Sequence, residues 1–155
     1  MLKHLLQALR GLFIRPAYAA TSAALVTAAI LYPLSDRSNL NLVGVHPPLV
    51  TVTQCAHDLT KGGFTVIDGM RTEEEQVKNV ASGVSWILKS RHLTGHAIDF
   101  AAHKNGKITF DENYYPPVAA AFNQCSLKYG IPIIWGGEWK VRDWGHIELD
   151  RRKYP

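Results

Sequence analysis

The sequence has few cysteines, few charges and no internal repeat, and each shortage excludes a class of protein. Two cysteines in 155 residues are too few for a disulfide-rich scaffold or a four-thiolate zinc site. Charged residues make up 19% and hydrophobic residues 46%, which excludes a disordered chain. The length fits one globular domain that can bury a substantial core.

Acidic residues are absent from the first 35 positions, which contain Lys3, Arg10 and Arg15. The remaining residues, 36–155, hold 14 basic and 13 acidic side chains, so the net charge of +4 arises largely at the amino-terminal end. Because the body is nearly neutral, the excess of basic residues gives no reason to expect a nucleic-acid partner.

Residues 16–35 form a run of twenty positions without a charged side chain, about the length at which a helix crosses the hydrocarbon core of a bilayer. Residues 1–15 place leucines at helical spacing and basic residues on the other side, which suits a helix at a membrane surface. Positive charge before the run keeps the amino terminus in the cytoplasm. We therefore expect a basic segment and signal anchor over 1–35. The anchor lies in the inner membrane, and residues 36–155 are exported across it into the periplasm.

The predicted anchor is rich in alanine, and its five strongly apolar side chains supply only about −2 kcal/mol toward insertion. Two alternatives therefore remain open. One is a cleaved signal peptide, because Ala17-Tyr18-Ala19 resembles a small-residue cleavage site. The other is a buried helix of a soluble protein. An anchor held this weakly also allows release of the protein into the periplasm.

The body mixes helices and short strands without regular alternation of the two, which predicts a small α+β domain with a short antiparallel sheet flanked by helices. Residues 36–39 are expected to be a polar linker. Helices are expected over 49–61, from a capping box that begins at Thr72, and over 118–129. Strands are expected over 64–68, 97–101, 107–110, 131–135 and 146–149.

Cys55 and Cys125 both fall on predicted helices. In an oxidising periplasm they could form a disulfide, and two separate buried thiols are the equal alternative. The sequence gives no distance between them, so both interpretations stay open.

Two short segments combine imidazoles with carboxylates. His92 and Asp99 lie seven positions apart across a glycine turn, and His146 follows Asp143 by three. Two imidazoles and one carboxylate suit Zn²⁺ and leave a fourth position for water, beside which Asp143 is the candidate base. Spacing alone also permits a plainer interpretation, in which His92 and His146 are hydrogen-bonded turn and strand residues.

The amino-acid sequence of these segments resembles that of the superfamily of zinc D-alanyl-D-alanine carboxypeptidases and phage endolysins. The motifs that carry the resemblance are Ser90-x-His92-x-x-Gly95-x-Ala97-x-Asp99 and Asp143-x-x-His146-x-Glu148-Leu149. Similarity extends over about 45–155. The stretches 64–72, together with Gln76, and 135–140 look like the L-alanyl-D-glutamate endopeptidase branch found in phage lysis enzymes.

The resemblance implies that His92, Asp99 and His146 are the zinc ligands. It makes Asp143 the catalytic base and Arg71 the group that steadies the substrate carbonyl as it becomes an oxyanion. Arg71 could instead be a surface cation paired with a glutamate of its own helix. The carboxypeptidase branch places Glu where Asp143 stands, which favours the endolysin branch. The stretch between Gly137 and Asp143 is a residue shorter than in many relatives, and this affects the loop that shapes the substrate cleft.

Other polar residues near the motifs receive lesser roles. His96 lies four positions after His92, but the intervening glycine disfavours the helix that a zincin pair requires, so we do not expect it to be a ligand. Glu148 is expected either to face away from the site or to support it from behind. His46, His57 and His103 have no partner pattern and are expected at the surface.

The expected function is therefore a peptidoglycan hydrolase, a phage or prophage endolysin that uses zinc-activated water to cleave stem peptides at the L-Ala–D-Glu bond. It is expected to act as a monomer tethered to the inner membrane through residues 16–35. A bacterial D,D-carboxypeptidase is the enzymatic alternative. A membrane-tethered cell-wall binding module without catalysis is the alternative from another class.

Overall fold

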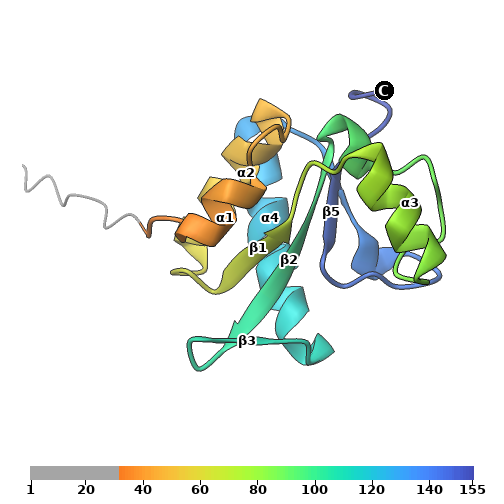
Figure 1. Ribbon diagram of the computed structural model, residues 1–155. Helices are drawn as coiled ribbons and strands as arrows, with labels where there is room; N and C mark the ends of the chain where they lie inside the picture. Colours follow the sequence, from red (N-terminus) through yellow and green to blue (C-terminus); the bar gives the residue numbers. More distant parts are fainter. Residues whose placement is uncertain (1–31) are drawn as a thin grey trace, which may run out of the picture.

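A five-stranded antiparallel sheet organises the chain in the computed structural model, which describes residues 32–155 (Figure 1). The order of the strands is β1-β2-β5-β4, and β3 pairs with β2 away from this path. The strands are β1 Phe64–Asp68, β2 Ala97–Lys104, β3 Lys107–Thr109, β4 Ile133–Trp135 and β5 His146–Leu149. The predicted α+β domain with an antiparallel sheet flanked by helices is confirmed.

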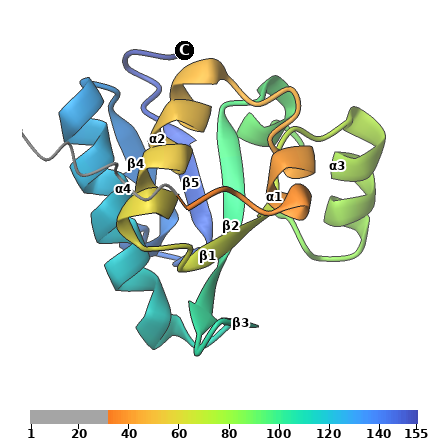
Figure 2. The same cartoon turned by 90° about the vertical axis from the view of Figure 1, so that its left-hand side faces the viewer.

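Four α-helices surround the sheet within residues 32–155, and α2 and α4 lie side by side on one of its faces, whereas α3 lies on the other side (Figures 1 and 2). The helices are α1 Asp36–Asn41, α2 Pro47–Leu59, α3 Glu73–Ala81 and α4 Tyr115–Tyr129. Three short 3-10 turns complete the domain, namely η1 Arg91–Thr94, η2 Glu112–Tyr114 and η3 Gly136–Glu138. The capping box predicted at Thr72 is present at the start of α3.

The two faces of the central strands differ in chemistry. Ile98 and Phe100 of β2 and Ile147 of β5 are fully buried in the hydrophobic core. Because successive side chains of a strand point to opposite faces, Asp99 and His146 project from the face that turns away from this core. The sheet thus separates the apolar core from the predicted metal ligands Asp99 and His146.

Cys55 of α2 and Cys125 of α4 form a disulfide, with a Cα–Cα distance of 5.9 Å. The structure thereby resolves the alternative that the sequence left open. The bond joins the two helices that cover the same face of the sheet, and both of its cysteines are buried.

The structure differs from the sequence prediction at residues 36–39, where the polar side chains predict a linker and the chain instead forms helix α1. In the structure Ser35 caps α1 by accepting a hydrogen bond from the backbone N–H of Ser38. Ser38 is itself buried, and its hydroxyl accepts a hydrogen bond of 3.1 Å from the backbone N–H of Val66 in β1. Contact with the sheet, rather than an apolar pattern, fixes this helix.

The end of the predicted membrane segment that the structure describes packs on the domain. Leu34 lies in the hydrophobic core with 7% of its surface exposed, and the backbone N–H of Tyr32 donates to Asp58 Oδ1 at 2.9 Å. His57, expected at the surface, is buried, and its Nδ1 lies 3.0 Å from the carbonyl oxygen of Tyr32. The rest of the predicted anchor, residues 1–31, lies outside the described residues. Within 32–155 no helix has the length and apolar character required to cross a bilayer.

Candidate active site

Two of the predicted ligands come from adjacent strands. Asp99 of β2 and His146 of β5 are direct partners in the antiparallel register, so their side chains emerge next to one another on the same face of the sheet. His146 Nδ1 lies 3.0 Å from Asp99 Oδ1. Although 47 positions separate them in sequence, strand pairing brings the two side chains together.

The third predicted ligand, His92, comes from the 3-10 turn η1 that precedes β2. The hydroxyl of Ser90 accepts a hydrogen bond from the backbone N–H of His92, and Gly95 ends the turn with a φ of 68°. The His92 ring is 2% exposed, and its Nδ1 lies 2.6 Å from the carbonyl oxygen of Gly69. Since a carbonyl only accepts hydrogen bonds, Nδ1 carries the proton and Nε2 presents a lone pair to the site.

Gly69, which supplies this carbonyl, has no side chain, and the carbonyl oxygen of Asn41 occupies the space that a side chain would need. A Cβ at this position would lie 1.8 Å from the carbonyl oxygen of Asn41. We expect Gly69→Ala to lower the free energy of unfolding by about 3 kcal/mol, the upper range for overpacking, and to displace the carbonyl that holds His92. Denaturant unfolding measures the loss.

Gly83→Ala is the control, because nothing lies within 4 Å of its Cβ. The only expected cost is that of an alanine at a φ of 74°, about 1 kcal/mol. Equal losses in the two variants would contradict the steric argument.

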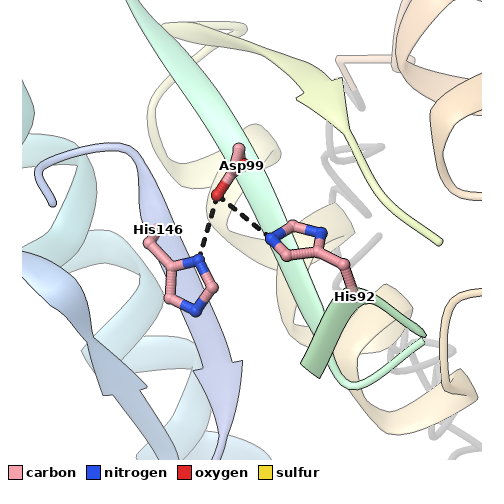
Figure 3. Close-up of side chains that lie close together, drawn as sticks. All are labelled: His92, Asp99 and His146. Atoms are coloured by element: carbon pink, nitrogen blue, oxygen red, sulfur yellow. Dashed lines mark hydrogen bonds and ion pairs between the residues drawn. The ribbon is translucent and has the colours of Figure 1, made fainter. Parts of the chain in front are cut away.

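His92, Asp99 and His146 form a group that fits a metal ion (Figure 3). One ligand atom from each residue lies within 4.8 Å of the other two, and His92 Nε2 is 3.3 Å from Asp99 Oδ1. His92 Nε2 is buried and has no hydrogen-bond partner among the described residues. A buried imidazole nitrogen left without a partner is costly, and a cation shared with the two other ligands would satisfy it. Two nitrogens and one carboxylate oxygen are a donor set typical of catalytic zinc.

The charges of the group are strongly coupled. Burial would raise the pKa of Asp99, but the hydrogen bond from His146 and the neighbouring imidazole of His92 hold that pKa far below its usual range. Burial would lower the pKa of His146, but hydrogen bonds to Asp99 and Glu148 raise it to about 9. In the absence of a metal, therefore, an imidazolium ion takes the place of the cation beside the Asp99 carboxylate.

Arg71 lies beside the group rather than at the surface. Its side chain is 11% exposed and forms ion pairs with Asp68 at 2.7 Å and with Asp99 at 2.8 Å. Its third nitrogen, Nη1, donates to Gln76 Oε1 at 3.1 Å. The alternative of a surface cation paired with a glutamate of α3 is wrong.

Asp143 lies in the loop before β5, where its backbone N–H donates to the carbonyl oxygen of Gly136 at 3.0 Å. Partial burial of the carboxylate, followed by the nearby charge of Asp99, raises the pKa of Asp143, whereas His146 and His92 lower it. A Cβ at Gly136 would lie 3.1 Å from the Cβ atoms of both Asp143 and His146, so Asp143 lies beside the metal-binding group. A carboxyl group with a raised pKa is suited to accept and return a proton.

The structure adds contacts that the sequence did not predict. Trp139, 37% exposed, packs its ring 5.0 Å from the imidazole of His146. Asp68, three positions before Arg71 at the end of β1, fixes the guanidinium, and this spacing was the only signal for it in the sequence. Glu148, by contrast, takes one of the two roles expected from the sequence, because it supports His146 from behind at 3.2 Å. His96 is not part of the metal-binding group and instead stacks on His46, with ring centroids 4.7 Å apart.

Comparison with known proteins connects the chain to one family. Residues 30–154 match the family model described as phage L-alanyl-D-glutamate peptidase. The L-alanyl-D-glutamate peptidase of Escherichia phage T5 is 34% identical over 127 residues, which cover 79% of this chain and 93% of the relative. The crystal structure of the Serratia marcescens L-Ala D-Glu endopeptidase ChiX is similar with a TM-score of 0.73 and 41% identity, over 79% of this chain and 92% of that chain. The chain belongs to the phage L-alanyl-D-glutamate peptidase family.

Proposed function

We propose that this protein is a zinc endopeptidase of the endolysin type that hydrolyses the L-alanyl–D-glutamate bond in the stem peptides of peptidoglycan. The observation that carries the proposal is the convergence of His92, Asp99 and His146 within 4.8 Å beside Asp143. The names of the related proteins supply the bond, and the donor set supplies the choice of metal.

In this proposal zinc is held by His92 Nε2, an oxygen of Asp99 and His146 Nδ1. When bound, zinc supplies Lewis acidity, which lowers the pKa of a water molecule toward neutrality and polarises the peptide carbonyl. Asp143 accepts a proton from the attacking water and later delivers it to the nitrogen of the leaving D-glutamate. Its raised pKa suits both transfers.

Arg71 would stabilise the negative charge that develops on the carbonyl oxygen. Three hydrogen bonds, to Asp68, Gln76 and Asp99, hold its guanidinium in place. A guanidinium has five N–H groups, so two remain for the substrate. This restraint keeps the donor group in position before the substrate arrives, which reduces the cost of organising it during the reaction.

Product analysis tests the proposal. Purified protein loaded with zinc, incubated with Gram-negative sacculi, is expected to generate new amino termini that belong to D-glutamate. Protein treated with a chelator serves as the control and is expected to generate none. Release of free D-alanine would identify a D,D-carboxypeptidase instead. Absence of both products with intact binding to sacculi would identify a non-catalytic binding module.

Zinc uptake is expected to release about one proton at pH 7, because a ligand imidazole must be neutral. The pKa of His146 in the metal-free protein is about 9, so the ring is protonated at neutral pH and the proton competes with zinc. Zinc affinity should therefore rise about tenfold per pH unit up to pH 9. Calorimetric titration in two buffers of different ionisation enthalpy measures the released proton, and a binding enthalpy independent of the buffer would contradict this expectation.

The proposal also includes the location of the enzyme. Residues 16–35 would attach it to the inner membrane as a monomer, with the catalytic domain in the periplasm or released there. The disulfide between Cys55 and Cys125 supports an oxidising compartment. Fractionation of cells before and after collapse of the membrane potential tests the attachment. Full-length protein in the membrane fraction under both conditions would exclude release, and soluble protein under both would exclude the anchor.

A further inference from the structure

A buried carboxylate next to the site has no part in the proposed reaction. Glu148 lies two positions after His146 on β5 and therefore projects from the same face of the sheet. Its flanking neighbours Ile147 and Leu149 lie in the core on the other face of the sheet. The side chain of Glu148 lies outside that core and is nevertheless only 4% exposed. Because burying a carboxylate is costly unless it is paired, the contacts of Glu148 call for an explanation.

The carboxylate of Glu148 has two partners. Its Oε2 lies 3.2 Å from His146 Nε2, and its Oε1 accepts a hydrogen bond of 3.0 Å from Arg151 Nε. The Arg151 side chain is 59% exposed, so it closes the solvent side of the pair. The Glu148 carboxylate is thereby held between the guanidinium of Arg151 and the edge of the His146 ring that points away from Asp99.

We infer that Glu148 is the positioning residue that selects which nitrogen of His146 binds the metal. A carboxylate accepts but does not donate, so the nitrogen that faces Glu148 must carry the proton. His146 Nε2 is then the donor, and it would keep its proton when zinc is bound. Nδ1 lies 3.0 Å from the Asp99 carboxylate and carries the second proton of the metal-free imidazolium, which is the proton that zinc would displace. The inference rests on the proposed zinc site.

With zinc bound, the two imidazoles would be in opposite tautomers, each fixed by a different acceptor. His92 donates from Nδ1 to the neutral carbonyl of Gly69 and offers Nε2. His146 would donate from Nε2 to the charged carboxylate of Glu148 and offer Nδ1. A charged acceptor increases the basicity of the ligand more than a carbonyl does, and loss of such a partner typically costs 10- to 100-fold in metal affinity.

A purely structural ion pair is the competing explanation, and the neighbouring residues provide a matched control. Arg152 pairs with the buried carboxylate of Asp150, and no contact of that pair reaches His146 among the described residues. Arg152→Ala therefore removes an ion pair of the same kind, one position from Arg151, without touching the metal ligands.

Competition with a chromophoric chelator measures the zinc affinity of the purified metal-free variants. Glu148→Leu is expected to lower the affinity 10- to 100-fold, whereas Glu148→Gln, which keeps an acceptor oxygen, should lose only a few-fold. Arg152→Ala should match the wild type. Circular dichroism identifies any variant that fails to fold, and Glu148→Gln then serves as the test.

Nitrogen NMR of the histidine side chains provides a readout that a structural role would not move. In the zinc-loaded wild type, His146 is expected to carry a proton on Nε2 and to bind through Nδ1. Binding through Nε2, or equal affinity in Glu148→Leu and the wild type, would overturn the inference while leaving the zinc site intact. A wild type that binds no zinc would instead refute the proposed function.

Discussion

Removal of the disulfide is expected to lower the free energy of unfolding by about 4 kcal/mol, the value that the chain-entropy model gives for a closed loop of about 70 residues. Cys55 and Cys125 are 70 positions apart, so the bond restricts a large part of the unfolded chain. The loss is a large fraction of the 5–15 kcal/mol that stabilises a typical domain, and corresponds to a decrease in Tm of about 15 °C for a domain of this size.

Thermal unfolding of the double variant Cys55→Ala/Cys125→Ala measures this effect. A reductant should lower the Tm of the wild type by a similar amount and leave the Tm of the variant unchanged. A wild type insensitive to complete reduction would show that α2 and α4 hold together through packing alone. The predicted sensitivity would make the protein most stable in an oxidising compartment, which agrees with the proposed export.

Replacement of Asp143 by Asn is expected to lower kcat by about 10³-fold, within the range for loss of a general acid–base group. Asparagine keeps the size of the side chain but cannot accept the proton of the attacking water. The three predicted metal ligands are untouched, so zinc content should equal that of the wild type. Initial rates of amino-terminus release from sacculi, paired with metal analysis, measure both quantities.

Glu138→Gln is the matched control for this variant. Glu138 is an exposed carboxylate five positions earlier in the same connection between β4 and β5, and its loss should leave the rate unchanged. Unchanged lysis by Asp143→Asn with full zinc content would remove Asp143 from the reaction and would favour binding or membrane disruption over hydrolysis.

Much of the secondary structure could be predicted because its causes are local. The capping box at Thr72, the short β-rich run of β1 and the glycine after α4 each act within a few residues. Helix starts were placed less well. The helix expected from 118 begins at Tyr115, since prolines are tolerated in the first turn of a helix. The sequence pattern does not predict helix α1, because its stabilising contact, between Ser38 and Val66, is tertiary.

The identity of the candidate site was also available from the sequence. The types and spacing of His92, Asp99, Asp143 and His146 define a donor set and a base, and the motif resemblance supplied Arg71. Alternation along β2 and β5 further ensures that Asp99 and His146 point away from the core, whichever strands pair.

Only the tertiary structure decided how these groups meet. The pairing of Cys55 with Cys125, the direct register of Asp99 opposite His146, and the support of His146 by Glu148 all depend on it. The first two join residues 70 and 47 positions apart, and no local pattern specifies such distances. The sequence determined which chemical groups are available, whereas strand pairing and helix packing determined which atoms face each other, because burial of the apolar face fixes the register of the sheet.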